Sequence, residues 1–233
     1  FDKLQVENSQ KTVKFASFVE GKIYTINACA TKAGIFVGGL SLQLTGDKGL
    51  GATKGATIGN DWSIRANISS YENILKKIEI IGNLMYKKGF KGMFGVDFIV
   101  RENGDCVIIE INARQTASVP MYTKIQLLKG EIPLSALHLL EFFNLDIYHK
   151  PAEYNNRNIE PDNYSQVFIR AENDIVINHQ VNMGVYRLQG DNAAINRYTD
   201  EVESTTIFLD EDRDKSLLFQ KYAVSIDFMD KQG

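Results

Sequence analysis

The stretch from Gly95 to Arg114 restricts the fold more than any other part of the chain, because two apolar runs flank the dipeptide Asn103-Gly104. This dipeptide favours a two-residue turn between antiparallel strands. The spacing therefore predicts a β-hairpin in which Asp97 lies opposite Glu110. Alternation gives the hairpin two faces. The predicted core face holds Val96, Phe98, Val100, Val107, Ile109 and Ile111, and the other face holds Asp97, Ile99, Ile108, Glu110 and Asn112.

The two opposed acids need a physical explanation. Opposed side chains have Cβ atoms about 5 Å apart, and like charges at that distance destabilise a strand pair. A cation would remove this cost, since Asp97, Glu110 and the amide oxygen of Asn112 form an all-oxygen set suited to Mg²⁺. Arg114 follows on the same face with a donor fork suited to phosphate or carboxylate. A solvent-facing strand whose acids pair with nearby lysines explains the pattern equally well.

Several other segments show regular patterns. Residues 12–19 and 23–30 predict a hairpin around Glu20-Gly21, and residues 35–44 predict a further strand. That strand enters a passage with eight glycines between Gly34 and Gly59, which is interpreted as an exposed loop. Residues 69–88 predict an amphipathic helix, and a shorter helix is predicted to begin at Pro133. His138 in that helix is predicted to be a packed or surface residue rather than a catalytic base.

The remaining third of the chain begins with a change in composition. Residues 151–161 are rich in polar side chains and are interpreted as a connection between lobes. Short strands are predicted beyond them at residues 165–171, 174–179, 183–188 and 205–209. This pattern predicts a small β-rich extension.

Composition argues against several classes of protein. The net charge of −3, without a cluster of Lys and Arg, argues against a nucleic-acid partner. No apolar run approaches the roughly 20 residues that span a bilayer, so no membrane partner is expected. Cys29 and Cys106 lie far apart and outside any C-x-x-C pattern, which argues against a zinc ribbon or a disulfide framework. A reducing cytoplasmic setting is the simplest expectation.

The motif G-V-D-F-I, followed by V-I-I-E-I-N-A-R, resembles the metal-binding strands of the ATP-grasp superfamily, which includes biotin carboxylases and the large subunit of carbamoyl phosphate synthetase. The segment F-A-S-F-V-E-G-K-I-Y-T-I-N resembles the hinge strand that runs along the adenine in that family. The resemblance covers residue 12 to about residue 143, and E-x-N-x-R is its most specific part.

The resemblance implies an α+β fold. Residues 1–150 would form the C-terminal lobe of an ATP-grasp fold, an antiparallel sheet with packed helices, and residues 151–233 a β-rich subdomain. The implied cofactors are ATP and Mg²⁺, with Mn²⁺ as a substitute. The implied site residues are Asp97, Glu110 and Asn112 on the metal, Arg114 as a catalytic residue at the transferred phosphoryl group or the acyl phosphate, and Ser17, Phe18 and Val19 along the adenine through their backbone.

The implied function is an ATP-dependent ligase that joins a small-molecule carboxylate to an amine through an acyl phosphate, and a homodimer is compatible with it. Family members also use a lysine and a glycine-rich flap before the hinge, which the short segment before residue 12 does not supply. Ile23 stands where a ribose-binding acid often lies. The chain is therefore expected to be a fragment without turnover of its own. The alternative is a non-catalytic module that uses the metal hairpin to bind a nucleotide or anion for regulation.

Overall fold

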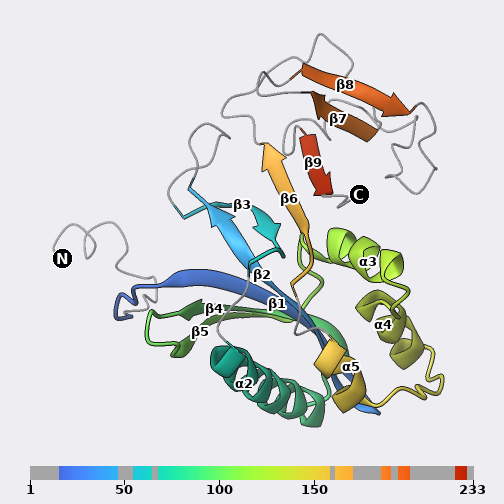
Figure 1. Ribbon diagram of the computed structural model, residues 1–233. Helices are drawn as coiled ribbons and strands as arrows, with labels where there is room; N and C mark the ends of the chain where they lie inside the picture. Colours follow the sequence, from blue (N-terminus) through green and yellow to red (C-terminus); the bar gives the residue numbers. More distant parts are fainter. Residues whose placement is uncertain are drawn as a thin grey trace, which may run out of the picture. The chain divides into compact units, whose positions relative to one another are not determined.

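The computed structural model describes residues 16–46, 55–64, 68–157, 161–169, 185–189, 194–199 and 224–229. The chain forms two compact units (Figure 1). The first comprises Phe1–Gln43, Asn60–Ser165 and Phe228–Gly233, and the second comprises Leu44–Gly59 and Gln166–Asp227. The division into domains of residues 1–150 and 151–233 stays a prediction.

Four antiparallel strands form the sheet of the first unit, in the order β5-β4-β1-β2. Their bounds are Cys106–Asn112 for β5, Gly92–Val100 for β4, Lys22–Thr31 for β1 and Gly34–Thr45 for β2. The predicted strands 23–30 and 35–44 are therefore confirmed. The predicted hairpin with residues 12–19 is wrong where the structure describes it, because residues 16–20 are irregular and β1 pairs with β2 and β4 instead. Residues 12–15 lie outside the described residues.

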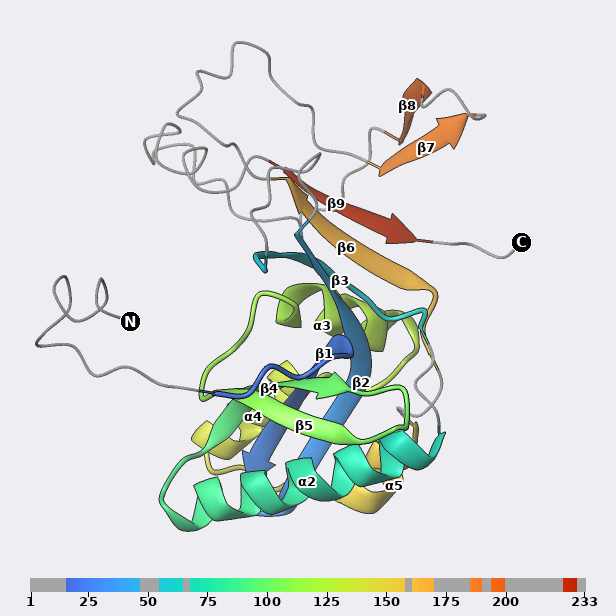
Figure 2. The ribbon, with the colours of Figure 1, turned by 90° about the vertical axis from the view of Figure 1, so that its left-hand side faces the viewer.

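Helix α2, Ile68–Lys87, covers one face of this sheet (Figure 2). It confirms the helix predicted at residues 69–88. Its Tyr71, Ile74 and Ile78 pack against a sheet surface of alternating apolar residues. That surface includes Tyr24, Ile26, Ala28, Val96 and Phe98. Burial of these side chains, each worth about 1.5–3 kcal/mol if large and apolar, is the main force that holds α2 in place.

Two helices cover part of the opposite face. They are α3, Val119–Leu128, and α4, Leu134–Phe142. A second apolar cluster joins them to the sheet through Cys29, Phe36 and Met93. The predicted helix at Pro133 is confirmed, with Pro133 at the N-cap rather than at the first helical position. Helix α3 was not predicted, because its apolar residues do not concentrate on one stripe.

The glycines of β2 are packed rather than exposed. Gly38 and Gly39 form a bulge opposite Asn27, and a Cβ atom on Gly38 would lie 2.6 Å from Cε1 of Tyr122. The Gly39 N–H donates a hydrogen bond to the Tyr122 hydroxyl. The interpretation of this part of the glycine-rich passage as an exposed loop is therefore wrong. Residues 47–54 of the passage lie outside the described residues.

The segment that follows α4 contains a short helix, α5, Pro151–Arg157. Its interpretation as a connection between lobes stays a prediction. Tyr154 and Asn155 of α5 are buried. The Asn155 side chain accepts a hydrogen bond from the Val37 N–H at 2.8 Å and donates one to the Ile35 carbonyl at 3.2 Å. One amide side chain thus satisfies two backbone groups on the edge of β2, as a neighbouring strand would.

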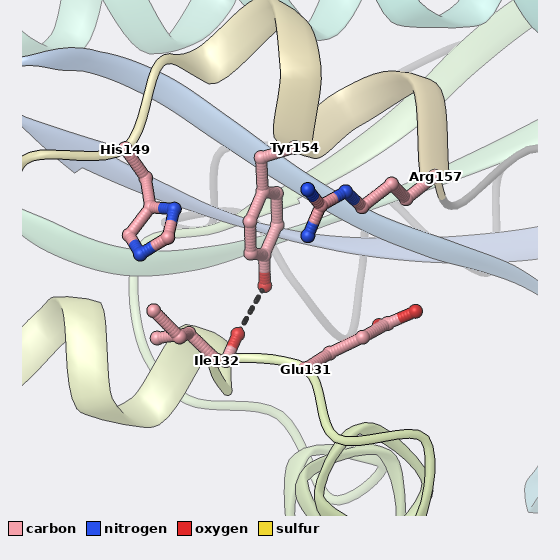
Figure 3. Close-up of a pocket in the computed structure, with 5 residues that line it drawn as sticks. All are labelled: Glu131, Ile132, His149, Tyr154 and Arg157. Carbon is pink, nitrogen blue, oxygen red and sulfur yellow. Dashed lines mark hydrogen bonds between the residues drawn. The ribbon is translucent and has the colours of Figure 1, made fainter.

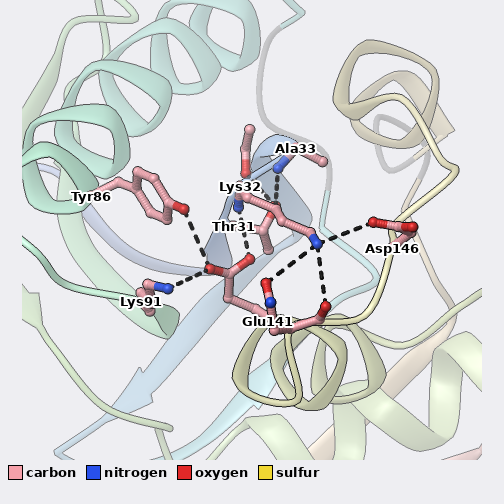
Figure 4. A network of polar contacts seen from close by, with 9 residues as sticks. Thr31, Lys32, Ala33, Tyr86, Lys91, Glu141 and Asp146 are labelled. Atoms are coloured by element: carbon pink, nitrogen blue, oxygen red, sulfur yellow. Dashed lines mark hydrogen bonds and ion pairs between the residues drawn. The ribbon is translucent and has the colours of Figure 1, made fainter.

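A buried carboxylate fastens the β1–β2 turn to α4 (Figure 4). Glu141, 3% exposed, accepts a hydrogen bond from the Lys32 backbone N–H at 2.7 Å. Its other oxygen lies 3.4 Å from the Lys91 ammonium and accepts from the Tyr86 hydroxyl at 3.4 Å. Beside it, the Lys32 ammonium pairs with Asp146 at 3.1 Å. Burial of Glu141 is tolerable because each of its oxygen atoms has a partner.

The second unit contains most of β3, Thr57–Asp61, of β6, Tyr164–Ile169, and of β9, Val224–Met229, in the order β3-β6-β9. Strands β7, Val185–Gln189, and β8, Ala194–Thr199, form a separate antiparallel ribbon. The strands predicted near residues 165–171 and 183–188 are confirmed. Those predicted at residues 174–179 and 205–209 lie outside the described residues.

The architecture confirms the predicted α+β class, an antiparallel sheet with packed helices and further strands near the C-terminus. Within the described ranges, no helix has the length and apolar character that a membrane span requires.

We predict that Asn155→Ala lowers the free energy of unfolding by about 1–3 kcal/mol, because it removes the buried hydrogen bonds that the Asn155 side chain makes with the Val37 N–H and the Ile35 carbonyl. Chemical denaturation monitored by tryptophan fluorescence measures this, since Trp62 is buried in the first unit. Asn156→Ala is the matched control on the exposed side of the same helix and should change little. Equal stability of the two variants would contradict the role given to Asn155.

We also predict a loss of stability on mild acidification that depends on His138. The Met93 N–H donates to His138 Nδ1 at 3.1 Å, so this nitrogen must be unprotonated, and burial lowers the pKa of His138 below its ordinary value of 6.5. The unfolded chain then binds a proton at a higher pH than the folded chain does. Stability is therefore fully present above pH 6.5 and is lost as the pH falls below that value.

His138→Gln keeps a possible acceptor for the Met93 N–H but does not titrate. Its melting temperature should fall less than that of the unsubstituted chain between pH 7.5 and pH 5.5. Parallel pH dependences for the two proteins would contradict this assignment.

Candidate active site

The face of the sheet that carries α3 and α4 is apolar at one end and polar at the other. Along β1, Cys29 packs under the helices, whereas Asn27 and Thr25 on the same face continue away from them. Strand β4 places Gly95 beside Asn27 and Asp97 beside Thr25. We call this region, with Asn112 and Glu110 of β5, the polar end of the sheet.

The β4–β5 hairpin that forms this region differs from its prediction at the turn. Residues 102–104 form a three-residue loop, closed by a hydrogen bond from the Arg101 N–H to the Asp105 carbonyl at 2.9 Å, with Gly104 at φ +84°. This is the three-residue alternative to the two-residue turn, with glycine at the left-handed position. The loop shifts the strand register by one residue, and a bulge beyond Phe98 shifts it back. Asp97 therefore pairs with Glu110, as predicted.

The corrected register changes which side chains reach the core. Ile108 pairs with Phe98 and packs against the α2 core together with Cys106, although Ile108 was predicted on the polar face. Ile109 lies at the bulge and is 42% exposed, and Ile111 is 45% exposed. The prediction that these last two residues lie in the core is wrong, because β5 is the edge strand and its core contact is made near the loop.

Both oxygen atoms of Asp97 receive hydrogen bonds. The Thr25 hydroxyl donates to Oδ1 at 2.7 Å, and the Asn112 amide donates to Oδ2 at 3.2 Å. The Gln43 amide in turn donates to the Thr25 hydroxyl. Burial raises the pKa of Asp97 and the charge of Glu110 adds to the rise, while the hydrogen bonds from Thr25, Gln43 and Asn112 oppose it. Two hydrogen bonds thus orient the carboxylate, while burial and the charge of Glu110 disfavour its ionised form.

No ion pair joins Asp97 or Glu110 to a cationic residue in the part of the chain that the structure describes. The alternative, in which nearby lysines neutralise the two acids, would require such an ion pair, and none is seen among these residues. The donor chemistry of the two carboxylates fits a hard divalent cation, which commonly takes one or two protein carboxylates. No group of three or more His, Cys, Asp and Glu side chains with metal-binding geometry occurs among the described residues, so a cation here would depend on two acids and other oxygen ligands.

Arg114 lies directly beside this set. Its Nη2 donates to Asn112 Oδ1 at 3.1 Å, and its Nη1 donates to the Gln115 carbonyl at 3.1 Å. The amide oxygen of Asn112 is therefore engaged by Arg114, and Asn112 would bind a cation only after this hydrogen bond is replaced. Arg114 is exposed, so its remaining N–H groups can reach a ligand.

The sequence prediction missed most of the side chains that support these acids. Thr25 was not singled out at all, although it contacts Asp97 directly. Gln43 and Ser41 are polar residues of strand β2. Gln43 donates a hydrogen bond to the Thr25 hydroxyl. Ser41 is 1% exposed, donates a hydrogen bond to the Thr25 carbonyl and accepts one from the Asn60 amide. Thr25 lies directly opposite Asp97 on the neighbouring strand. It could have been identified only if the pairing of β1 with β4 had been known.

The segment predicted to contact adenine precedes β1. Ser17 and Phe18 are exposed, with 91% of the Phe18 surface accessible, and Val19 is partly buried. The adenine contact through the backbone of residues 17–19 stays a prediction.

A small cavity of about 20 Å³ lies elsewhere, between α5 and the α3–α4 connection (Figure 3). Glu131, Ile132, His149, Tyr154 and Arg157 line it, and the Tyr154 hydroxyl closes one side by donating to the Ile132 carbonyl at 2.9 Å. Its volume suits about one water molecule. It is therefore not a substrate site.

Comparison with protein families identifies a match over residues 2–118, half of the chain, to the family described as the ATP-grasp domain. This chain belongs to the ATP-grasp family. The polar end of the sheet lies within the matched residues, as do Arg114 and the segment 17–19. Comparison with curated proteins gives no match.

Several solved structures are similar to part of this chain. Carboxyaminoimidazole ribonucleotide synthase of Aspergillus clavatus, complexed with ATP, is 17% identical, with a TM-score of 0.45 over 67% of this chain and 36% of that chain. An L-amino acid ligase of Bacillus licheniformis is 15% identical, with a TM-score of 0.46 over 65% and 36%.

The biotin carboxylase domain of the Hydrogenobacter thermophilus 2-oxoglutarate carboxylase, in complex with MgADP and bicarbonate, is 12% identical, with a TM-score of 0.47 over 64% of this chain and 30% of that chain. The present chain spans about a third of the length of these three proteins.

We predict that Glu110→Gln raises the melting temperature of the metal-free ATP-grasp chain at pH 7 by about 1–3 °C, because it removes a like charge opposed to Asp97 without breaking a described hydrogen bond. Differential scanning calorimetry at low ionic strength measures the effect. Glu102→Gln, in the exposed hairpin loop, is the control for a change in net charge. A lower melting temperature for Glu110→Gln would show that the Glu110 charge is already compensated.

Proposed function

We propose that the protein to which this chain belongs is an ATP- and Mg²⁺-dependent ligase that joins a small-molecule carboxylate to an amine through an acyl phosphate. The observation that supports this most strongly is the opposition of Asp97 and Glu110 across β4 and β5, with Arg114 beside them. Membership of the ATP-grasp family is consistent with it.

Asp97 and Glu110 would hold Mg²⁺, and Asn112 would join them when Arg114 turns toward a substrate. Bound there, Mg²⁺ would neutralise charge on the phosphates of ATP. The hydrogen bonds from Thr25 and Asn112 fix the Asp97 carboxylate before any ligand arrives. This preorganisation matters because phosphoryl transfer depends on positioning and on charge compensation rather than on a protein nucleophile.

Arg114 would bind the phosphoryl group that is transferred. In the first step a carboxylate oxygen of the substrate attacks the terminal phosphorus of ATP, and ADP leaves. In the second step the amine nitrogen attacks the acyl carbon, phosphate leaves and the amine loses a proton. A guanidinium group can follow the phosphate through both steps, since it offers several N–H donors in one plane.

The proposal extends to the adenine contact, the location and the assembly of the protein. The backbone of Ser17, Phe18 and Val19 would lie along the adenine. The cytoplasmic location rests on the cysteine pattern of the sequence, because Cys29 and Cys106 lie far apart and outside any C-x-x-C motif. Assembly as a homodimer stays a prediction.

Metal binding tests the proposal most directly. We predict that the chain binds Mn²⁺ in the presence of ATP, as measured by electron paramagnetic resonance of free Mn²⁺, and that the double variant Asp97→Asn, Glu110→Gln binds it at least about tenfold more weakly. The matched control is Asp105→Asn with Glu102→Gln, which removes one acid in the hairpin loop and one directly after it, and it should leave the affinity unchanged. Equal affinities for the two double variants would contradict the metal site.

Turnover in the whole protein separates a ligase from a regulatory module. A ligase releases ADP only when a suitable carboxylate is present, and hydroxylamine traps its acyl phosphate as a hydroxamate. Binding of Mn²⁺ and ATP, with no ADP released from ATP in the presence of any carboxylate of a broad panel, would favour a nucleotide-binding regulatory role.

A further inference from the structure

The segment between β5 and α3 is fastened to the sheet by hydrogen bonds among three side chains, those of Asn27, Thr116 and Ser118. The Asn27 amide donates to Ser118 Oγ at 2.9 Å, and the Thr116 hydroxyl donates to Asn27 Oδ1 at 2.7 Å. The hydroxyl oxygens of Thr116 and Ser118 lie 2.9 Å apart. Because the single hydroxyl hydrogen of Thr116 is used on Asn27, Ser118 must be the donor in this third bond. The result is a closed ring of three hydrogen bonds, in which each residue donates once and accepts once.

The ring is buried at its base. Asn27 and Ser118 are each 2% exposed, and Thr116 is partly buried above them. Thr116 can approach the sheet because Gly95 has no side chain: a Cβ atom there would lie 2.4 Å from the Thr116 methyl group. The position of Thr116 is thus fixed both by hydrogen bonds and by shape.

Ser118 takes part in this ring instead of capping its own helix. It occupies the N-cap position of α3, where serine is favoured because its oxygen can accept a hydrogen bond from the first turn. Its side chain makes no such bond, and its backbone lies in the helical region at φ −80° and ψ −14°. Helix stability alone would favour the capping arrangement, so the ring is better explained by a requirement on the segment that precedes the helix.

That segment carries Arg114. The Arg114 guanidinium spans two anchors, the Asn112 side chain on β5 and the Gln115 carbonyl. Gln115 is the direct neighbour of Thr116, so the position of Thr116 determines where this carbonyl lies. We infer that Thr116, held between Asn27 and Ser118, is a positioning residue for Arg114, and that the ring fixes the loop at residues 113–118 so that the guanidinium faces the polar end of the sheet.

The inference about Arg114 rests on the proposed function, but the fixing of the loop does not. Hydrogen exchange of the ligand-free chain therefore comes first. Thr116→Val keeps the shape of the side chain and removes its hydroxyl, so exchange of the amides at residues 113–118 should accelerate about fivefold or more, as expected for the loss of one net hydrogen bond. Thr116→Ser retains the hydroxyl and should restore most of the protection.

Thr123→Val is the matched control, because it removes a threonine hydroxyl that bonds to Ser135 between α3 and α4. It should leave exchange at residues 113–118 unchanged. Unchanged exchange in Thr116→Val, or acceleration spread equally over the whole first unit, would overturn the role of the ring.

The positioning of Arg114 by Thr116 is tested by the preference of the chain for Mn²⁺-ATP over Mn²⁺-ADP, measured by calorimetry. If Arg114 binds the terminal phosphoryl group, Arg114→Ala and Thr116→Val should each reduce this preference, and Thr116→Val should cause no further reduction in the Arg114→Ala background. Additive reductions would overturn the inference, because Thr116 would then act independently of Arg114. Equal binding of ATP and ADP by the unsubstituted chain would instead contradict the proposed role of Arg114, and the hydrogen exchange would still decide whether the ring fixes the loop.

Discussion

The pairing of β1 with β4 is the constraint on which the rest of the first unit depends. It joins segments that lie far apart in sequence, from Lys22 paired with Val100 to Ala30 paired with Gly92. Alternation along this pair gives one face to the α2 core and the other to Thr25, Asn27 and Asp97. The same backbone ladder thus supports the largest apolar cluster and holds the acid of the candidate site. A change in its register would disturb both at once.

In the β4–β5 hairpin, a shift in strand register at the loop is reversed by a bulge a few residues away. Its three-residue loop shifts the register by one, and the bulge beyond Phe98 restores it before Asp97. The bulge also turns Ile109 outward while Ile108 packs inward. Bulges occur often beside functional sites because they redirect a side chain without disrupting the strand. Here the redirected residue is Glu110, which is brought opposite Asp97.

The sequence contained enough information to predict the strands and helices with clear periodicity, together with the Asp97–Glu110 pair. It did not predict what depends on long-range contacts. The sequence of helix α3 shows no single apolar stripe, because Leu127, which is 62% exposed, is as apolar as the buried Tyr122 and Ile125. Gly38 and Gly39 resemble loop residues until the ring of Tyr122 is placed against them. Thr25 contacts Asp97, more than seventy residues away in sequence, only because β1 pairs with β4.

Asn155 has a consequence beyond the hydrogen bonds that it makes. An open strand edge can recruit an extended segment of another molecule, and natural proteins protect such edges with loops, helices or charges. By occupying the Ile35 carbonyl and the Val37 N–H, the side chain of Asn155 denies these two groups to an incoming strand. Helix α5 therefore protects this stretch of β2 from edge-to-edge aggregation, with a single amide in place of a whole strand.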